Sequence, residues 1–289
     1  MNQKVLLTGV TGFLGSRLAI SLIGNGCEVI ALKRKYSSLD RIESILSKIH
    51  LFDIEDIDYS MIFKLHDKID IVIHTATCYG RNNETPMEIF ETNTGFPLKL
   101  LDAANIANVA KFINTDTKLD KYLNLYSLSK NHLLEWGRFY SMKRKIEFIN
   151  MRLEHFYGPN DDDSKFTSYV INNCLLNSSS LELTMGQQKR DFIFIDDVVS
   201  AYLTVINRRN QIGDNWFSEF EVGSGKPITI RKFVEMVYRM TGSKIVLEFG
   251  AIPYRVDEVM YSRANIKALT DLGWKCKFNL TQGLKLTII

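Results

Sequence analysis

Cysteine, long apolar runs and blocks of like charge are all scarce in this sequence. Its four cysteines, Cys27, Cys78, Cys174 and Cys276, lie far apart and form no Cys-x-x-Cys pair. Such spacing supports neither a metal site nor a disulfide framework and is typical of buried thiols in a reducing compartment. We therefore expect no metal ion, and we expect the protein to be cytoplasmic.

No apolar run approaches the roughly 18 residues that a membrane-spanning helix needs. The N-terminal Met-Asn-Gln-Lys leads directly into a strand-like run, which leaves no room for a signal peptide. The net charge is only +3 and no run of five or six like charges occurs, so neither nucleic acid nor a membrane surface is an expected partner. With 289 residues, 45% of them hydrophobic, the chain can form a core domain and a second lobe.

A glycine-rich turn lies between a predicted strand and a predicted helix at the N-terminus. The strand-like run Lys4–Thr8 comes first, the glycines recur at intervals of three, and apolar residues then follow at helical spacing up to Leu22. This order is typical of dinucleotide-binding folds, where glycines let the backbone approach a pyrophosphate at a helix N-terminus. The alternative is a plain tight turn. The predicted cofactor-binding residues of the turn are Gly9, Thr11, Gly12, Phe13, Leu14 and Gly15.

The end of the predicted second strand, residues 28–32, bears on the choice of cofactor. An acidic residue there would suit the ribose hydroxyls of NAD, whereas an arginine suits the 2′-phosphate of NADP. This sequence has Lys33 and Arg34, and no carboxylate before Asp40. A guanidinium group matches two phosphate oxygens at once. We predict NADP(H) in preference to NAD(H); the alternative is a solvated basic turn.

Two further short apolar runs predict the third and fourth strands, at residues 49–52 and 69–73. Asp53 could accept a hydrogen bond from the adenine amino group or be a simple turn residue, and we group Ile54 with it as a cofactor contact. The fourth run is continuous enough to be buried in a parallel sheet. We interpret His74, at its end, as a packed and hydrogen-bonded residue rather than a catalyst.

The residues that follow the fourth strand are predicted to face ligands, because open α/β sheets bind them at the carboxyl ends of the strands. Ala76 is assigned to the cofactor, and the loop Cys78–Glu84, with Tyr79, to the substrate. Asn93 lies on a predicted helix from Glu91 to Leu101, where it could order water or backbone near the reaction centre or be an ordinary polar residue.

Tyr126 and Lys130 form the most informative pair in the chain. On a helix, residues four apart share one face, and only Tyr126 among the twelve tyrosines has a lysine four positions later. A tyrosine has a pKa near 10, which a nearby ammonium lowers, so the pair suits proton transfer to a developing alkoxide. The alternative is a surface helix with a solvated lysine. Thr115, at the end of a predicted fifth strand, would place a hydroxyl beside the same carbonyl oxygen.

Taken together, these motifs resemble the extended short-chain dehydrogenase/reductase family of sugar-nucleotide epimerases, dehydratases and reductases. The resemblance spans nearly the whole chain, and the second half is most similar to bacterial CDP-abequose and CDP-paratose synthases, which act in O-antigen assembly. Its motifs are Gly9-x-x-Gly12-x-x-Gly15, His74-x-Ala76, Glu91-x-Asn93-x-x-Gly95, Thr115, Tyr126-x-x-x-Lys130, Arg152-x-x-x-x-Tyr157-Gly158-Pro159 and Arg190-Asp191-Phe192.

The resemblance implies a role for each site residue. Thr115 would bind the substrate carbonyl, Tyr126 would donate the proton, and Lys130 would hold the nicotinamide ribose. The predicted substrate-binding residues are Tyr79, Asn93, Lys165, Arg190 and Arg255. For Arg190 an ion pair with the adjacent Asp191 stays an alternative, and for Arg255 a turn charge does.

One departure from the family pattern affects the predicted reaction. The family's 4,6-dehydratases have Thr-Asp-Glu where this chain has Thr115, Asp116 and Thr117, and elimination without that glutamate lacks its base. We therefore predict reduction of the 4-keto group of a CDP-linked deoxy sugar by NADPH. A 4-epimerase that keeps its NAD bound is the nearest alternative, and a non-catalytic nucleotide-sensing protein is a third possibility.

The predicted fold is α/β, a Rossmann-type doubly wound parallel sheet with a smaller C-terminal substrate-binding lobe. Residues 1–153 are assigned to the cofactor-binding domain, with returning segments near 192–206 and 220–223, and residues 154–289 mostly to the second lobe. The predicted helix from Leu125 to Lys143 has a broad apolar stripe, which fits packing on the sheet and on a partner. From the family, we expect a homodimer through this helix and that of Asn93.

Overall fold

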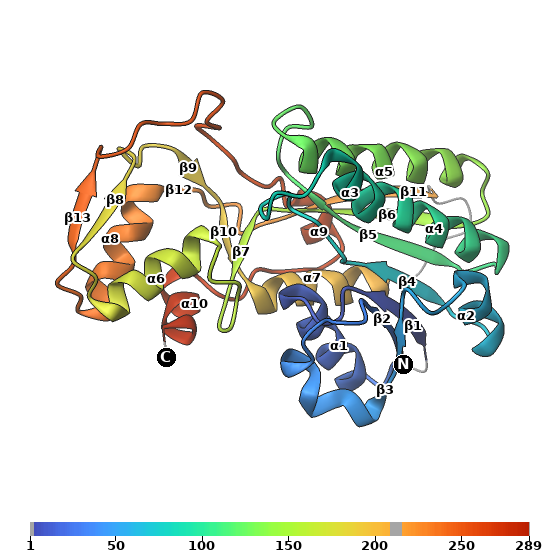
Figure 1. Cartoon of the computed structure of the whole chain (residues 1–289). Coiled ribbons are helices and arrows are strands. Elements are labelled where there is room, and N and C mark those ends of the chain that lie inside the picture. Colours follow the sequence, from blue (N-terminus) through green and yellow to red (C-terminus); the bar gives the residue numbers. More distant parts are fainter. Residues whose placement is uncertain (1–2, 209–215, 289) are drawn as a thin grey trace. The chain divides into compact units, whose positions relative to one another are not determined.

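The computed structural model describes residues 3–208 and 216–288, which form two compact units (Figure 1). Of the described residues, unit 1 takes 3–152, 207–208 and 216–220, and unit 2 takes 153–206 and 221–288. Residues 192–206, which were predicted to return to the first unit, belong to unit 2. Of the predicted segment 220–223, Phe220 lies in unit 1, and residues 220–222 are part of strand β11 (Phe217–Val222) of the central sheet. Residues 195–206 form helix α7, which packs on strands β7 and β10 of unit 2.

A seven-stranded sheet forms the centre of unit 1, with strand order β11-β6-β5-β4-β1-β2-β3. Strand β1 pairs in parallel with β2 and β4, β2 pairs with β3, and β4 with β5. Because the order reverses direction beside β1, this is the doubly wound topology, and the predicted fold class is confirmed. The strands are β1 (Lys4–Thr8), β2 (Glu28–Lys33), β3 (Ile49–Asp53), β4 (Ile71–His74), β5 (Lys111–Thr117), β6 (Glu147–Leu153) and β11 (Phe217–Val222).

The helical segments of unit 1 cover this sheet, and aromatic residues fill the space beneath α5. Phe148 of β6 stacks on Phe112 of β5 and on Phe217 of β11, with ring centroids 5.6 and 6.4 Å apart. A Cβ atom at Gly137 would overlap the Phe148 ring, so glycine lets α5 approach closely. The segments are α1 (Phe13–Gly24), the 3₁₀ helix η1 (Asp40–Lys48), α2 (Tyr59–Leu65), α3 (Pro86–Phe90), the π-helix η2 (Glu91–Gly95), α4 (Phe96–Ile106) and α5 (Leu125–Met142).

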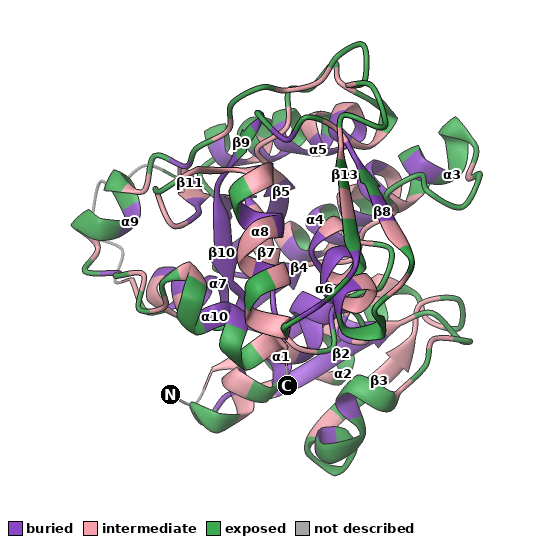
Figure 2. Cartoon of the chain, turned by 90° about the vertical axis from the view of Figure 1, so that its left-hand side faces the viewer, coloured by how far each residue is buried: buried purple, intermediate pink, exposed green. Residues whose placement is uncertain are grey.

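Two predicted elements differ from those observed in ways that affect the site. The fifth strand continues to Thr117 rather than ending at Thr115, because Asp116 is held between neighbouring strands as described below. The helix predicted from Glu91 begins as a π-helix and becomes α-helical only at Phe96. Helix α3, just before it, is exposed apart from Ile89, as the burial colouring shows (Figure 2).

Unit 2 consists of short strands and helices around its own core, to which the fully buried β10 belongs (Figure 2). Within the described residues, its strands form two-stranded sheets that pair β10 with β7, β12 with β9, and β13 with β8. Its elements are β7 (His155–Tyr157), α6 (Phe166–Leu176), β8 (Ser180–Leu183), β9 (Lys189–Arg190), β10 (Phe192–Phe194), α7 (Ile195–Ile206), β12 (Ile228–Thr229), α8 (Ile230–Thr241), β13 (Val246–Phe249), α9 (Lys267–Asp271) and α10 (Leu280–Thr287).

In the described ranges, no helix is both long and apolar enough to span a bilayer. Those ranges also hold no group of three or more His, Cys, Asp or Glu side chains arranged for a metal ion.

Candidate active site

The glycine-rich turn has the geometry of a pyrophosphate-binding loop. Gly9 has a φ of +71°, and a Cβ atom there would lie 2.6 Å from the backbone nitrogen of Ala76. A Cβ atom at Gly15 would overlap the Gly9 carbonyl. Helix α1 follows Gly12 without a side-chain cap, so its first N–H groups are open to an anionic ligand. This loop therefore fits a dinucleotide, as the sequence predicted for Gly9 to Gly15.

Hydrogen bonds fasten the end of β4 to the end of β1 beside this turn. The Thr75 hydroxyl donates to the Thr8 carbonyl at 2.7 Å, and the Ala76 N–H donates to the Thr8 hydroxyl at 3.3 Å. His74 Nδ1 lies 2.8 Å from that hydroxyl. Burial, with a smaller effect of the Lys130 charge, holds the His74 pKa well below its ordinary value. His74 is thus the neutral, packed strand-end residue that was predicted.

Two of the residues assigned to the adenosine end of the cofactor bind each other. Lys33, at the end of β2, and Asp53, at the end of β3, are neighbours in the sheet and form an ion pair. The Lys33 ammonium also donates to the carbonyl oxygens of Arg34 and Lys35. The charge of Lys33 is therefore largely neutralised within the protein, and the exposed Arg34 is the better candidate for a 2′-phosphate.

Helix α5 carries Tyr126 and Lys130, and a capping box fixes where it begins. The Asn124 side chain accepts a hydrogen bond from the Ser127 N–H at 2.9 Å, and the Ser127 hydroxyl lies 3.2 Å from the Asn124 N–H. Because this cap sets the register of the helix, Tyr126 lies in its first turn and Lys130 one turn later.

Within the described part of unit 1, Lys130 is the buried cation that most clearly lacks a hydrogen-bond acceptor. Its side chain is only 1% exposed, and within the described residues its Nζ atom has no hydrogen-bond acceptor. Burial lowers its pKa from 10.5 to about 8, although the Asp116 charge opposes this. A buried ammonium without an acceptor is unfavourable. The hydroxyls of a nicotinamide ribose would supply acceptors, so Lys130 also fits the predicted cofactor.

The electrostatic environment of Tyr126 differs from the one expected. Burial raises the Tyr126 pKa well above 10, and Tyr79 and Asp116 raise it further. A hydrogen bond with Thr117 and the charge of Arg81 act in the opposite direction. The Tyr126 pKa is thus raised and not lowered in the chain without ligands, and the proton-transfer role of the Tyr126–Lys130 pair stays a prediction. Arg81, from the loop after β4, is the cation that acts on the phenol.

Thr117 is a site residue that the sequence analysis missed. Thr115 is the hydroxyl predicted to lie beside Tyr126, and the structure also brings the Thr117 side chain to the Tyr126 hydroxyl. Side chains two apart on a strand share one face, so Thr115, which is 9% exposed, and Thr117 point the same way. The extra strand length could have been read from the β-branched Thr117.

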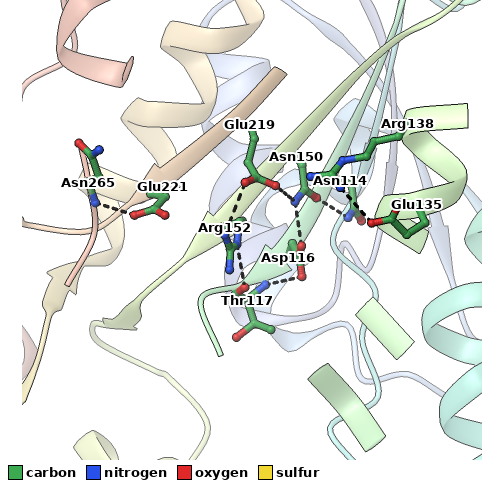
Figure 3. A network of polar contacts seen from close by, with 10 residues as sticks. All are labelled: Asn114, Asp116, Thr117, Glu135, Arg138, Asn150, Arg152, Glu219, Glu221 and Asn265. Carbon is green, nitrogen blue, oxygen red and sulfur yellow. Dashed lines mark hydrogen bonds and ion pairs between the residues drawn. The ribbon is translucent and has the colours of Figure 1, made fainter. Parts of the chain in front are cut away.

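A ladder of buried polar residues holds the strands on which these groups lie (Figure 3). The Asn150 amide donates to Asp116 Oδ2 at 2.8 Å and to Glu219 at 3.2 Å, and accepts from Asn114 at 2.8 Å. The Thr117 N–H donates to Asp116 Oδ1 at 2.7 Å. Burial raises the Asp116 pKa. Asp116 therefore fixes strand geometry behind Thr115 and Thr117, and its carboxylate oxygens are both engaged by protein donors.

Asn93 positions the loop after β4 against helix α5. It is fully buried in the π-helix. Its side-chain oxygen accepts from the Cys78 N–H at 2.8 Å, and its amide donates to the Cys78 carbonyl at 2.8 Å and to the Ser129 hydroxyl at 3.0 Å. Because these bonds occupy the amide, Asn93 orders backbone near the site, and its predicted contact with substrate has no support in this geometry.

The basic residues predicted for substrate binding in unit 2 are mostly engaged in ion pairs. Arg190 pairs with Glu258 at 2.5 Å, and Lys165 pairs with Asp161 at 2.9 Å. Arg190 does not pair with Asp191, whose carboxylate accepts from the backbone of residues 224, 225 and 264. Arg255 is exposed. A diphosphate would have to compete with Glu258 and Asp161 for these cations.

A family model described as the NAD dependent epimerase/dehydratase family matches residues 5–223. The chain belongs to this family. The predicted resemblance to the extended short-chain dehydrogenases is thereby confirmed. One relative, a CDP-abequose synthase from Salmonella muenchen, is 37% identical over 99% of this chain and 97% of its own length.

Two solved structures share the fold of this chain. A UDP-glucose 4-epimerase from Thermotoga maritima, solved with UDP-glucose, is 24% identical, with a TM-score of 0.87 over 99% of this chain and 97% of that one. A UDP-glucuronic acid 4-epimerase from Bacillus cereus, solved with UDP-glucuronic acid and NAD, is 21% identical, with a TM-score of 0.86 over 99% of this chain and 98% of that one.

Proposed function

We propose that this protein is an enzyme that reduces the 4-keto group of a nucleoside-diphosphate deoxy sugar with NADPH. The observation that carries the proposal is the buried, unpartnered Lys130 ammonium on the helix of Tyr126, within the described part of a chain that has a pyrophosphate-binding turn. CDP is the nucleotide that we favour, with a 6-deoxy or 3,6-dideoxy 4-keto sugar, because the relative that is 37% identical is a CDP-abequose synthase.

The chain's own side chains would bind, orient and protonate the substrate. A bound nicotinamide supplies the hydride. Lys130 would hold the nicotinamide ribose, while Thr115 and Thr117 would donate hydrogen bonds near the carbonyl oxygen as negative charge grows on it. Tyr126, whose raised pKa keeps it protonated at neutral pH, would then give its proton to that oxygen. In balance, one ketone, one NADPH and one proton yield one alcohol and one NADP⁺.

The cofactor preference rests on Arg34. It is exposed beside the end of β2, where a 2′-phosphate would lie in this fold. The pairing of Lys33 with Asp53 weakens the basic character of this position, so we expect preference for NADP(H) rather than exclusion of NAD(H).

A 4-epimerase is the second candidate, and the Lys33–Asp53 pair favours it, because the pair neutralises a charge that would otherwise favour the 2′-phosphate of NADP over the ribose hydroxyls of NAD. Stoichiometry separates the two. A reductase consumes one NADPH for each sugar, whereas an epimerase leaves the free nicotinamide pool unchanged. The purified chain would be mixed with NADPH or NADH and with CDP-, dTDP- and GDP-linked 4-keto deoxy sugars, and reduced nicotinamide followed by absorbance.

Replacement of Tyr126 tests the assigned proton donor. We expect Tyr126→Phe to lower turnover by at least about 100-fold, since general acid catalysis contributes that much, while NADPH affinity measured by fluorescence titration changes little. Tyr122→Phe is the control, because Tyr122 is 77% exposed just before the same helix. Near-full activity of Tyr126→Phe would contradict the proposal.

We further propose that the protein acts in the cytoplasm, in the synthesis of O-antigen or related lipopolysaccharide sugars, and that it is a homodimer.

A further inference from the structure

The ring of Tyr79 contacts both a cation, Arg81, and the proposed proton donor, Tyr126. The Arg81 guanidinium carbon is 4.9 Å from the centroid of the Tyr79 ring. The Tyr79 ring centroid is in turn 5.1 Å from that of Tyr126, with an interplanar angle of 45°. Tyr79 therefore contacts the Arg81 guanidinium through a cation–π interaction and the Tyr126 ring in a tilted arrangement.

The loop that carries Tyr79 and Arg81 is held in place by contacts before, between and after these two residues. Asn93 makes two hydrogen bonds to the backbone of Cys78, immediately before Tyr79. Gly80 has a φ of +69°, and a Cβ atom there would lie 2.8 Å from Ile89 of helix α3. After Arg81, the Asn82 N–H donates to the Glu84 carboxylate at 2.7 Å. These contacts hold the Tyr79 ring against the Tyr126 ring.

We propose that Arg81 and Tyr79 are positioning residues for the proton transfer: Tyr79 packs against the Tyr126 phenol, and Arg81, through Tyr79, places a positive charge that favours release of the phenol proton. This role rests on the proposed function of Tyr126. Around the phenol, the loop contributes Tyr79 and Arg81, and β5 contributes Asp116 and the Thr117 hydroxyl. Asp116 opposes release of the proton, and Arg81 is placed to offset it.

The positive charge of Arg81 affects how readily Tyr126 gives up its proton. A nearby cation stabilises the phenolate more than the neutral phenol and lowers the Tyr126 pKa, which is the direction found for Arg81. Removal of this charge leaves a weaker acid. Because Arg81 is exposed, solvent screens its charge, and we expect Arg81→Gln to lower the turnover number by about three- to tenfold rather than to abolish it.

The experiment measures the titration of residue 126 directly, without turnover. A fluorinated tyrosine incorporated at position 126 brings its titration into an accessible pH range, and ¹⁹F NMR reports the midpoint. We expect Arg81→Gln to raise this midpoint. The same substitution in a Tyr79→Leu background should raise it by less, because Tyr79 holds the guanidinium in place and the two residues act as one unit. Arg81→Lys, which keeps the charge, should restore most of the difference.

Arg138→Gln is the matched control. Arg138 also stacks on an aromatic ring in unit 1, 5.1 Å from the Phe217 centroid, and it lies on the same helix as Tyr126. The control should leave the midpoint where it is in the parent protein. Equal midpoints for Arg81→Gln and Arg138→Gln would overturn the proposal, as would Arg81→Lys behaving like Arg81→Gln. An active Tyr126→Phe variant would instead contradict the proposed function and leave the titration result intact.

Discussion

Lys130 shows at the scale of one residue how a binding group can lower the stability of the protein that carries it. Its pKa falls from 10.5 to about 8 on burial, which corresponds to about 3 kcal/mol against the folded state. Below pH 8 the amine is charged in both the folded and unfolded states, and this cost is present in full. As the pH rises from about 8 towards 10.5, the folded state loses its proton first and the cost declines.

We therefore predict that Lys130→Met raises the free energy of unfolding of the ligand-free protein at neutral pH, by up to about 3 kcal/mol. The advantage should shrink between pH 8 and 10.5, as measured by urea denaturation across that range. The same variant should lose NADPH binding and activity, as is common for residues kept for function.

Lys111 offers a control for this measurement because it is a buried lysine that has partners. Its ammonium donates to the Arg208 carbonyl at 2.8 Å and lies 4.0 Å from Glu147. Lys111→Met leaves the buried Glu147 with less compensation and should be destabilising. If Lys130→Met were also destabilising at neutral pH, the account of Lys130 as an unpaired buried charge would be wrong.

At the scale of single elements, the turn from β1 to α1 is the part most tightly constrained by backbone geometry. Gly9 combines a positive φ with a position where a Cβ atom would meet the backbone of Ala76. Neither constraint can be relieved by a side-chain rotation, since backbone atoms define both.

We predict that Gly9→Ala lowers NADPH affinity at least about 100-fold or lowers the melting temperature markedly. Gly24→Ala, at the end of helix α1, is the control: nothing lies within 4 Å of a Cβ atom there, and alanine should stabilise the helix by up to about 1 kcal/mol. Thermal unfolding and fluorescence titration of both variants test the pair. Equal cofactor affinities would contradict the assignment of this turn.

The sequence predicts some of these structural features better than others. The glycine spacing and the strand-like run before it were sufficient to predict the turn, because both features are local. The pairing of Lys33 with Asp53 was not predictable, since it depends on the register between β2 and β3. Likewise, the i, i+4 rule put Tyr126 and Lys130 on one helix, but the charge that acts on the phenol comes from Arg81, whose position depends on a loop.

At the scale of the whole molecule, helix α5 exposes an apolar surface opposite the sheet. Its large exposed side chains include Trp136 at 44%, Phe139 at 45% and Met142 at 71% exposure. The sequence predicted a broad stripe that would pack on the sheet and on a second subunit, and this exposure supports the proposed homodimer. Apolar groups gathered on one helix are a common sign of an interface.

We predict that Phe139→Glu weakens dimerisation at least about tenfold, because a carboxylate placed in an apolar contact costs about 1.4 kcal/mol or more. Light scattering after gel filtration would detect the shift to monomer. Leu176→Glu is the control, since Leu176 is 78% exposed on α6 of unit 2. A monomeric parent protein, or an unchanged Phe139→Glu dimer, would contradict the proposed homodimer.

The π-helix between α3 and α4 has a consequence for how this chain tolerates changes in length. A π turn contains one more residue than an α turn, and the extra residue rotates the following part of the helix by about 100°. Deleting Thr92 would restore an ordinary α-helix, yet it would swing Asn93 away from Cys78 and Ser129, to which it is bonded. A shorter and more regular helix would thus release the loop after β4 that carries Tyr79 and Arg81, so the irregular turn is needed to hold this loop in place.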